Sequence, residues 1–230
     1  APSWTEAFGQ ANGDYISFLE AGDSLAAEAL FELVARLQSE PGLDVVYSDE
    51  DWLSESGRRE DPLFKPDWDA DLFLSTNYLA RFGIFRRRLV SEVGGFHSSA
   101  GGGEIYDLLL RLTERTARIA HVPKVLYHCR RHPATADAVL ARHAANRHGS
   151  RAIEDALRRR GRPGRAQAVF TRGGSRCYAT RFELTQRPLV SIVIPTRDMR
   201  ALLQTTLESI WERTDYDRYE IIVIDNQSTD

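Results

Sequence analysis

Apolar residues in the first part of the chain alternate between strand-like and helix-like patterns. Residues 14–20 and 43–48 are short, mostly apolar runs of the kind that form buried strands. Between them, apolar side chains recur at helical spacing over residues 25–37, and Asp23 or Ser24 is placed to cap that helix. This order of strand, helix and strand predicts an α/β sheet, in which ligands bind at the carboxyl ends of the strands.

The middle of the chain continues with elements of both kinds. Residues 57–66 have the composition of a loop, and residues 106–113 show helical apolar spacing. An extended segment follows at 119–128, and a helix from about residue 143 to residue 160 ends at the turn 161–164. The alternation of strands and helices therefore continues, as in an α/β protein.

A new α/β unit begins near residue 190. Residues 190–194 and 219–224 are predicted buried strands, and residues 202–211 between them form an amphipathic helix. A βαβ unit needs further strands and covering helices to bury both faces of its sheet. We therefore expect the core of this unit to be open where those elements belong.

The composition is that of a soluble globular protein. The chain has 230 residues, of which 42% are hydrophobic and 27% are charged, which argues against disorder, collagen and coiled coil. No apolar run approaches the ~20 residues that span a bilayer. Cys129 and Cys177 lack metal-site or disulfide-framework spacing, so a reducing, cytoplasmic location is expected. Because no signal peptide or initiator Met is present, we expect a piece of a longer protein.

Charge is concentrated in the middle of the chain. Residues 111–187 carry 18 Lys and Arg against 5 Asp and Glu, although the whole chain has a net charge of −3. Such a segment can bind phosphates, nucleic acid or an anionic membrane surface. Since no nucleic-acid recognition motif accompanies it, specific nucleic-acid binding is not expected. Peripheral contact with the inner face of the membrane remains open.

Six short motifs lie in order between residues 47 and 130. They are 47–51 (YSDED), 64–68 (FKPDW), 75–78 (STNY), 94–96 (GGF), 106–108 (YDL) and 122–130 (VPKVLYHCR). Their order resembles that of family 2 glycosyltransferases of bacterial surface-polysaccharide synthesis. The likeness covers roughly residues 11–133, as the C-terminal part of a GT-A domain. Residues 190–230, with 194–196 (IPT) and 223–230 (VIDNQSTD), separately resemble the nucleotide-binding start of a second such domain.

The resemblance implies a tandem organisation. We expect residues 1–140 to be the C-terminal part of a first module, 141–187 a basic helical connector, and 188–230 the start of a second module. The fold class is then α/β: an incomplete GT-A module, Rossmann-like, of the nucleotide-diphospho-sugar transferase type, followed by the βαβ start of another.

The resemblance also implies an activity. Such enzymes transfer a sugar, with inversion, from a nucleotide-diphosphate donor to a glycan or lipid-linked acceptor in cell-envelope polysaccharide synthesis. Mg²⁺ or Mn²⁺ offsets the charge on the leaving diphosphate, and a carboxylate takes the proton of the acceptor hydroxyl.

The metal motif of the family departs from its usual form here. It falls on residues 20–23, and Gly22 stands where a carboxylate is expected to touch the metal. Glu20 and Asp23 remain as metal ligands, directly or through water. His128 matches a family histidine that approaches the metal and the diphosphate. Alternatively, Asp23 caps a helix and His128 is structural.

The catalytic base is also changed. Ile105 occupies the position of the family's catalytic Asp, and an Ile side chain cannot accept a proton. Glu104 and Asp107 are the candidate replacements. The alternative is that they stabilise a helix N-terminus, which is the more favoured reading for Asp107.

The resemblance implies that the remaining candidate residues bind the nucleotide sugar. In the first module these are Asp49, Asp51, Lys65 and Arg130, with Trp68 beside Lys65 in the acceptor cleft. The alternatives are turn capping for the Asp residues and loop packing for Lys65 and Trp68.

In the second module, Thr196, Asp225 and Asn226 match family positions around the base and ribose, where amide and carboxylate groups form hydrogen bonds. A different class of function stays open, because Gly22 and Ile105 suit a catalytically degenerate module that positions a partner or an acceptor.

Overall fold

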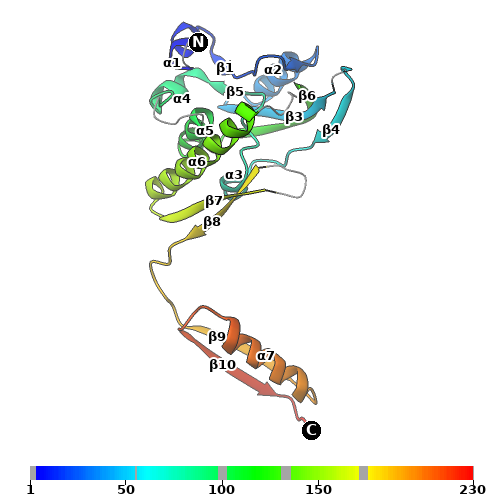
Figure 1. The fold of residues 1–230 in the computed structure, drawn as a ribbon, viewed down its shortest axis with the longest axis vertical. Helices are drawn as coiled ribbons and strands as arrows, with labels where there is room; N and C mark the ends of the chain where they lie inside the picture. Colours follow the sequence, from blue (N-terminus) through cyan, green and yellow to red (C-terminus); the bar gives the residue numbers. More distant parts are fainter. Residues whose placement is uncertain (1–3, 55, 98–102, 131–135, 171–175, 230) are drawn as a thin grey trace. The chain divides into compact units, whose positions relative to one another are not determined.

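The structure is a computed structural model that describes residues 4–54, 56–97, 103–130, 136–170 and 176–229. It divides into two compact units, Ala1–Glu183 and Leu184–Asp230 (Figure 1). The predicted three-part division with boundaries at 140 and 187 stays a prediction.

Unit 1 is built on a mixed sheet, so the predicted α/β class is confirmed. Its two long strands, β3 (Val45–Leu53) and β6 (Ile119–Arg130), run parallel. The shorter strands pair antiparallel in the order β1-β5-β3-β6-β2, with β4 also on β3. They are β1 (Tyr15–Ser17), β2 (Ser24–Leu25), β4 (Arg59–Leu63) and β5 (Gly83–Arg86).

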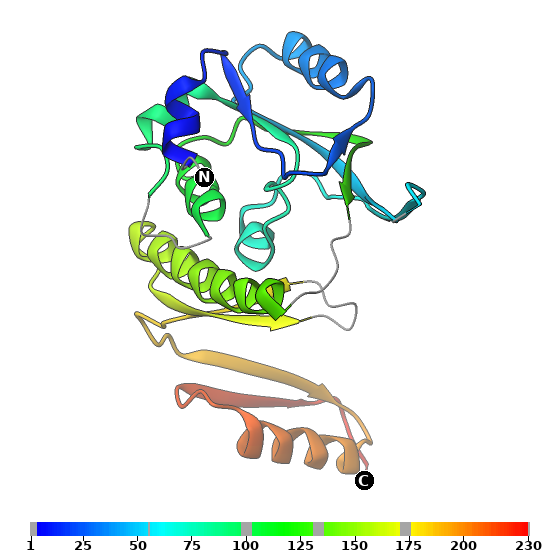
Figure 2. The same ribbon diagram turned by 45° about the horizontal axis from the view of Figure 1, so that its top comes forward.

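Helices cover both faces of this sheet. Successive side chains of a strand point to opposite faces, so Val45 and Tyr47 pack into one buried cluster and Val46 into another. Residues of α5 and α6 belong to the first cluster and residues of α2 to the second. Figure 2 shows α2, in blue, on one side of the sheet and α5 and α6, in green, on the other. The helices of unit 1 are α1 (Trp4–Gln10), α2 (Ala29–Ser39), α3 (Ala70–Ser75), α4 (Arg87–Glu92), α5 (Glu104–Thr113) and α6 (Ala136–Arg159).

Two local predictions were wrong. Residues 57–66 contain β4, which pairs with the edge of β3. The helix expected from residue 25 begins at Ala29, and its N-terminal neighbour Glu28 makes no side-chain capping bond. Asp23 therefore does not cap α2, because β2 separates the two.

A β-hairpin that the sequence did not indicate follows α6. Strands β7 (Gly164–Phe170) and β8 (Arg176–Phe182) pair antiparallel. Gly149 of α6 lets the helix approach the hairpin, since a Cβ there would collide with the ring of Tyr178. The predicted connector therefore includes parts that belong to the core of unit 1, with Ile153, Leu157 and Tyr178 buried.

Unit 2 is a βαβ element, as predicted. Strands β9 (Val190–Thr196) and β10 (Tyr219–Asp225) run parallel, and α7 (Arg200–Arg213) joins them. No described residue from 184 to 229 is buried. The expected open core is therefore present within this unit.

Candidate functional site

Three consecutive carboxylates of β3 lie inside unit 1. Asp49, Glu50 and Asp51 are each at most 5% exposed. A strand buried on both faces is normally apolar, and buried carboxylates are stable only with partners. Each of the three has its own set of partners, and together they define the candidate site of unit 1.

Asp51 holds the imidazole of His128. The two residues are aligned in the parallel pairing of β3 and β6, and Asp51 Oδ1 lies 2.6 Å from His128 Nδ1. The other carboxylate oxygen accepts a hydrogen bond from Arg59 Nε of β4, at 2.6 Å. With Nδ1 engaged, Nε2 is the imidazole nitrogen left for a ligand.

Glu50 is the centre of a buried ion cluster. It lies 2.9 Å from Lys65 Nζ and 3.3 Å from Arg81 Nη1. Lys65 Nζ also donates to the carbonyl oxygen of Arg81, at 3.0 Å. Burial lowers the pKa of Lys65, and the attraction of Glu50 opposes this shift. Lys65 is thus held inside the protein, and its predicted contact with a nucleotide sugar stays a prediction.

Asp49 fixes the segment that carries Lys65. Its Oδ1 accepts the backbone N–H of Lys65 at 2.8 Å and lies 2.7 Å from His121 Nε2. The imidazole of His121 stacks on the ring of Tyr47, with ring centroids 4.9 Å apart. Asp49 and Lys65 are therefore brought together, in contacts that anchor a loop.

The turn at residues 20–23 lies beside the end of β6. The Asp23 N–H donates to the Glu20 carbonyl oxygen at 3.2 Å. The Asp23 carboxylate accepts from the Tyr127 hydroxyl at 2.5 Å and from the Arg130 N–H at 2.7 Å. Arg130 Nε donates to the carbonyl oxygen of Gly22 at 3.0 Å. The structure thus brings Asp23 and Arg130 together next to His128, whose strand pairs with Ser24.

The predicted metal ligands do not form a complete site. Among the described residues, no group of three His, Cys, Asp or Glu is placed to hold a metal ion. Asp23 already accepts hydrogen bonds on both oxygens. Glu20, Asp23 and His128 therefore remain predicted ligands.

The helix that carries the candidate bases has a buried ion pair. Asp107 Oδ2 accepts from Arg111 Nη2 at 2.7 Å and lies 3.2 Å from His97 Nδ1. Arg111 also donates to the carbonyl oxygens of Val93 and Gly95. These contacts favour the helix-stabilising reading of Asp107.

The two neighbouring positions of α5 differ from each other. Ile105 packs against the core cluster that contains α5 and α6. Glu104 is the first residue of the helix and is partly exposed. Of the two candidate bases, Glu104 is thus the more open to solvent.

Unit 2 gathers its three candidate residues at one edge. Thr196 and Asp225 are aligned at the carboxyl ends of β9 and β10, and the N–H of Asn226 donates to the Thr196 carbonyl oxygen at 2.8 Å. Ser228 donates to the Asp225 carboxylate. This is the edge at which parallel α/β sheets bind ligands.

Several site residues carry no signal in the sequence. Arg59, Arg81 and His121 come from different elements and meet the β3 carboxylates only in the fold. Glu50 is different, because it stands between the predicted residues Asp49 and Asp51 in the sequence.

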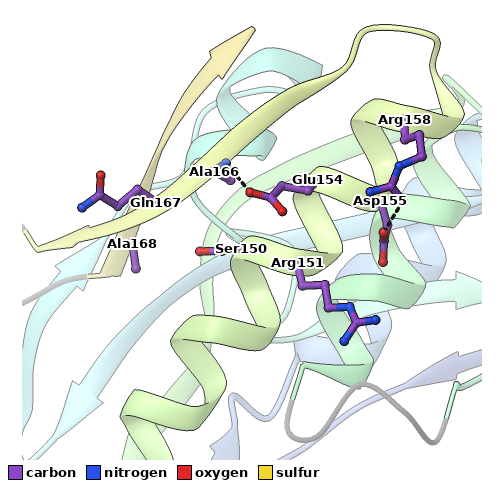
Figure 3. A pocket seen from close by; sticks show the side chains of 8 residues that line it. All are labelled: Ser150, Arg151, Glu154, Asp155, Arg158, Ala166, Gln167 and Ala168. Atoms are coloured by element: carbon purple, nitrogen blue, oxygen red, sulfur yellow. Dashed lines mark hydrogen bonds and ion pairs between the residues drawn. The ribbon is translucent and has the colours of Figure 1, made fainter. Parts of the chain in front are cut away.

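A polar groove elsewhere in unit 1 has no comparable chemistry. It has a volume of about 630 Å³ and lies between α6 and β7 (Figure 3). Glu154 accepts from the Ala166 N–H, and Asp155 pairs with Arg158. Because both carboxylates of this groove are already engaged, the carboxylate cluster of β3 remains the candidate site of unit 1. No described helix combines the length and hydrophobicity needed to cross a bilayer.

Comparison with curated proteins finds two long relatives. The chain is 35% identical, over its full length, to the O-antigen biosynthesis protein RfbC of Myxococcus xanthus. It is 40% identical over 96% of its length to the uncharacterized protein y4gI of Sinorhizobium fredii. The chain spans 18% and 24% of the lengths of these relatives.

Solved structures resemble the chain less closely. A crystal structure of S. aureus TarS 1–349 in complex with UDP-GlcNAc matches 66% of this chain and 50% of its own, at 16% identity and a TM-score of 0.47. This likeness is too low to bear on function.

A family model identifies the tail. Residues 191–230 match the model of Glycosyl transferase family 2, and they contain Thr196, Asp225 and Asn226 at the carboxyl edge of β9 and β10. The part of the chain at residues 191–230 is therefore similar to glycosyl transferase family 2.

Proposed function

We propose that this chain is part of a nucleotide-sugar glycosyltransferase that transfers a sugar, with inversion, to a glycan or lipid-linked acceptor. The observation that carries the proposal is the family match of residues 191–230 together with the convergence of Thr196, Asp225 and Asn226. Hydroxyl, carboxylate and amide groups at this edge suit hydrogen bonds to a base and a ribose.

We place the activity in cell-envelope polysaccharide synthesis, at the cytoplasmic face of the membrane. The support is the similarity along the whole chain to a protein named for O-antigen biosynthesis. In this proposal unit 1 is the C-terminal part of one GT-A module and unit 2 the start of another. Mg²⁺ or Mn²⁺ remains the expected cofactor.

Donor binding by the full-length protein tests the proposal. Calorimetry with a panel of UDP-, GDP- and dTDP-sugars is expected to find one donor whose affinity falls roughly tenfold or more in Asp225→Asn, since a hydrogen bond to a charged group is lost. Asp217→Asn, an exposed Asp of the same unit that pairs with Arg187, is the matched control. If no nucleotide sugar binds the wild-type protein, the proposal fails.

A second candidate function for unit 1, a positioning role without catalysis, is supported by separate observations. Ile105 packs into the core and Asp107 is held by the buried cation of Arg111, so neither residue is available as a base. Unit 1 would then position an acceptor or a partner while another module performs the transfer.

Sugar transfer by full-length Glu104→Gln separates the two readings of unit 1. Loss of a general base lowers turnover about 100-fold or more. Unchanged turnover favours the positioning role, and a large loss assigns catalysis to unit 1.

A further inference from the structure

We propose that Phe64 and Asp67 form a binding platform for a sugar ring of the acceptor glycan. This inference rests on the proposed function, because it names a subsite for the acceptor in unit 1. It is carried by an exposed aromatic ring and an exposed carboxylate on one anchored loop beside the candidate site.

Phe64 is exposed to solvent, whereas the nearby aromatic residue Trp68 is partly buried. The exposed fraction of Phe64 is 71%. Trp68, expected from the sequence to line the acceptor cleft, instead packs against Phe73 and Tyr78, with ring centroids 5.3 and 6.2 Å apart. Phe64 therefore replaces Trp68 as the aromatic residue that we expect to contact the acceptor.

The backbone around Phe64 is anchored on both sides. Leu63 before it pairs with Glu50 of β3. After it, the N–H of Lys65 is bound by Asp49 at 2.8 Å, and the carbonyl oxygen of Pro66 accepts from the Tyr47 hydroxyl at 2.5 Å. An exposed aromatic ring on a fixed backbone loses little conformational entropy when a ligand binds.

Asp67 follows Phe64 by three residues on the same loop and supplies a polar group. Its side chain is 98% exposed, and one oxygen lies 3.5 Å from Nδ1 of the buried His121. An ionised carboxylate accepts hydrogen bonds on both oxygens, so Asp67 keeps acceptor sites for the hydroxyl groups of a ligand.

The two groups match the two sides of a sugar. The C–H face of a pyranose is apolar and weakly positive, so it suits the negative face of an aromatic ring. Its hydroxyl groups donate hydrogen bonds to a carboxylate. A lipid chain would use only the ring, and a phosphate would be repelled by Asp67.

The platform is next to the candidate site. Strand β4, which leads into Phe64, pairs with β3, and β3 pairs with β6. Two interstrand spacings, or ~10 Å, separate β4 from β6 and its His128. A sugar bound at Phe64 would thus lie next to β3, the strand that carries Asp51.

Saturation-transfer NMR on the full-length protein tests the platform. The probe is O-polysaccharide fragments released by mild acid from the lipopolysaccharide of the producing strain. We expect transfer from aromatic protons to sugar C–H protons in the wild type. Binding is expected to weaken roughly fivefold to tenfold in Phe64→Ala, the size of one aromatic contact, and to be retained in Phe64→Trp.

The matched control is Phe31→Ala, which removes a ring of similar exposure, 73%, from α2. Asp67→Asn should weaken binding without abolishing the aromatic transfer. The platform is wrong if the wild type shows no transfer, or if Phe64→Ala binds as tightly as Phe31→Ala.

Donor binding separates this inference from the proposed function. If the glycan fragments bind through Phe64 but no nucleotide sugar binds, the platform stands and the transferase proposal fails. If a donor binds normally to Phe64→Ala and to the wild type while neither binds glycan, only the platform fails.

Discussion

Asp51 Oδ1 lies 2.6 Å from His128 Nδ1, and both side chains are nearly buried. Strands β3 and β6 align the two residues, and Arg59 holds the second oxygen of Asp51. A carboxylate on one ring nitrogen fixes the orientation of the imidazole and the role of its other nitrogen. This pair therefore sets which way His128 faces the candidate site.

Replacing Asp51 with Asn should loosen this arrangement. Arg59 and His128 lose a charged acceptor, so we expect the free energy of unfolding to fall by about 2 kcal/mol. Urea unfolding measures the change, and imidazole ¹⁵N shifts report the orientation of His128. Asp71→Asn, whose side chain is 80% exposed, should change the free energy by less than about 0.5 kcal/mol. Equal effects of the two variants would contradict the role of Asp51.

The Asp107 and Arg111 pair should be structural. Asp107→Asn leaves the buried guanidinium of Arg111 without its carboxylate, and we expect a loss of about 2 to 3 kcal/mol in unfolding free energy. Glu92→Gln breaks an exposed pair with Arg88 and should cost under about 1 kcal/mol. Chemical denaturation compares them. A stable Asp107→Asn variant with lost sugar transfer would instead support catalysis by Asp107.

Asp44 should make unit 1 sensitive to acid. Although burial opposes it, hydrogen bonds from Thr116, Arg86 and Arg118 hold the pKa of Asp44 below its ordinary value of 3.8. A carboxyl whose pKa is lower in the folded state stabilises the fold above its unfolded pKa and loses that effect as pH falls through the folded pKa.

The difference in stability between the wild type and Asp44→Asn should therefore be full at neutral pH and shrink below about pH 4. Unfolding measured between pH 7 and pH 2 checks this. A difference that is constant across that range would show that Asp44 is not responsible.

Gly22 should resist substitution for conformational reasons. Its φ is +94°, in a region that side chains with a Cβ rarely adopt. Gly22→Ala and Gly22→Asp are each expected to cost about 1 to 2 kcal/mol in unfolding free energy. Thermal unfolding measures this cost, with Gly9→Ala, where a Cβ meets no atom within 4 Å, as the control. The departure from the family metal motif is thus tied to the shape of the turn.

Cys129 should be unreactive in the folded protein. Burial raises the pKa of its thiol to about 12, and only a thiolate attacks alkylating reagents. At pH 8 iodoacetamide should modify the partly exposed Cys177 and spare Cys129, as mass spectrometry would reveal, while both react in urea. Equal rates in the native protein would contradict this.

Local patterns predicted the parts of the site that lie at strand ends. Thr196 and Asp225 meet because parallel strands place their carboxyl ends at one edge. Sequence spacing alone was enough for these two residues. The same rule placed Asp49 and Asp51 after the end of a strand, and this was wrong, because β3 continues past them to Leu53.

Contacts between distant residues were not predictable in this way. Arg81 donates a hydrogen bond to Glu50, although the two residues are 31 positions apart in the sequence. Strand β4 has no apolar alternation and contains Pro62, which an edge strand tolerates. Strand β7 presents only small residues, Ala166 and Ala168, to the core. Tertiary pairing decides each of these elements.

The exposed apolar surfaces of unit 2 have a consequence for the synthesis of the protein. Strands β9 and β10 present Val193, Ile222 and Ile224 largely to solvent, and α7 buries none of its residues. While the ribosome synthesises unit 2, the βαβ element by itself buries none of its described residues. Exposed apolar strands at this stage favour aggregation, so unit 2 is the segment that we expect chaperones to bind during synthesis.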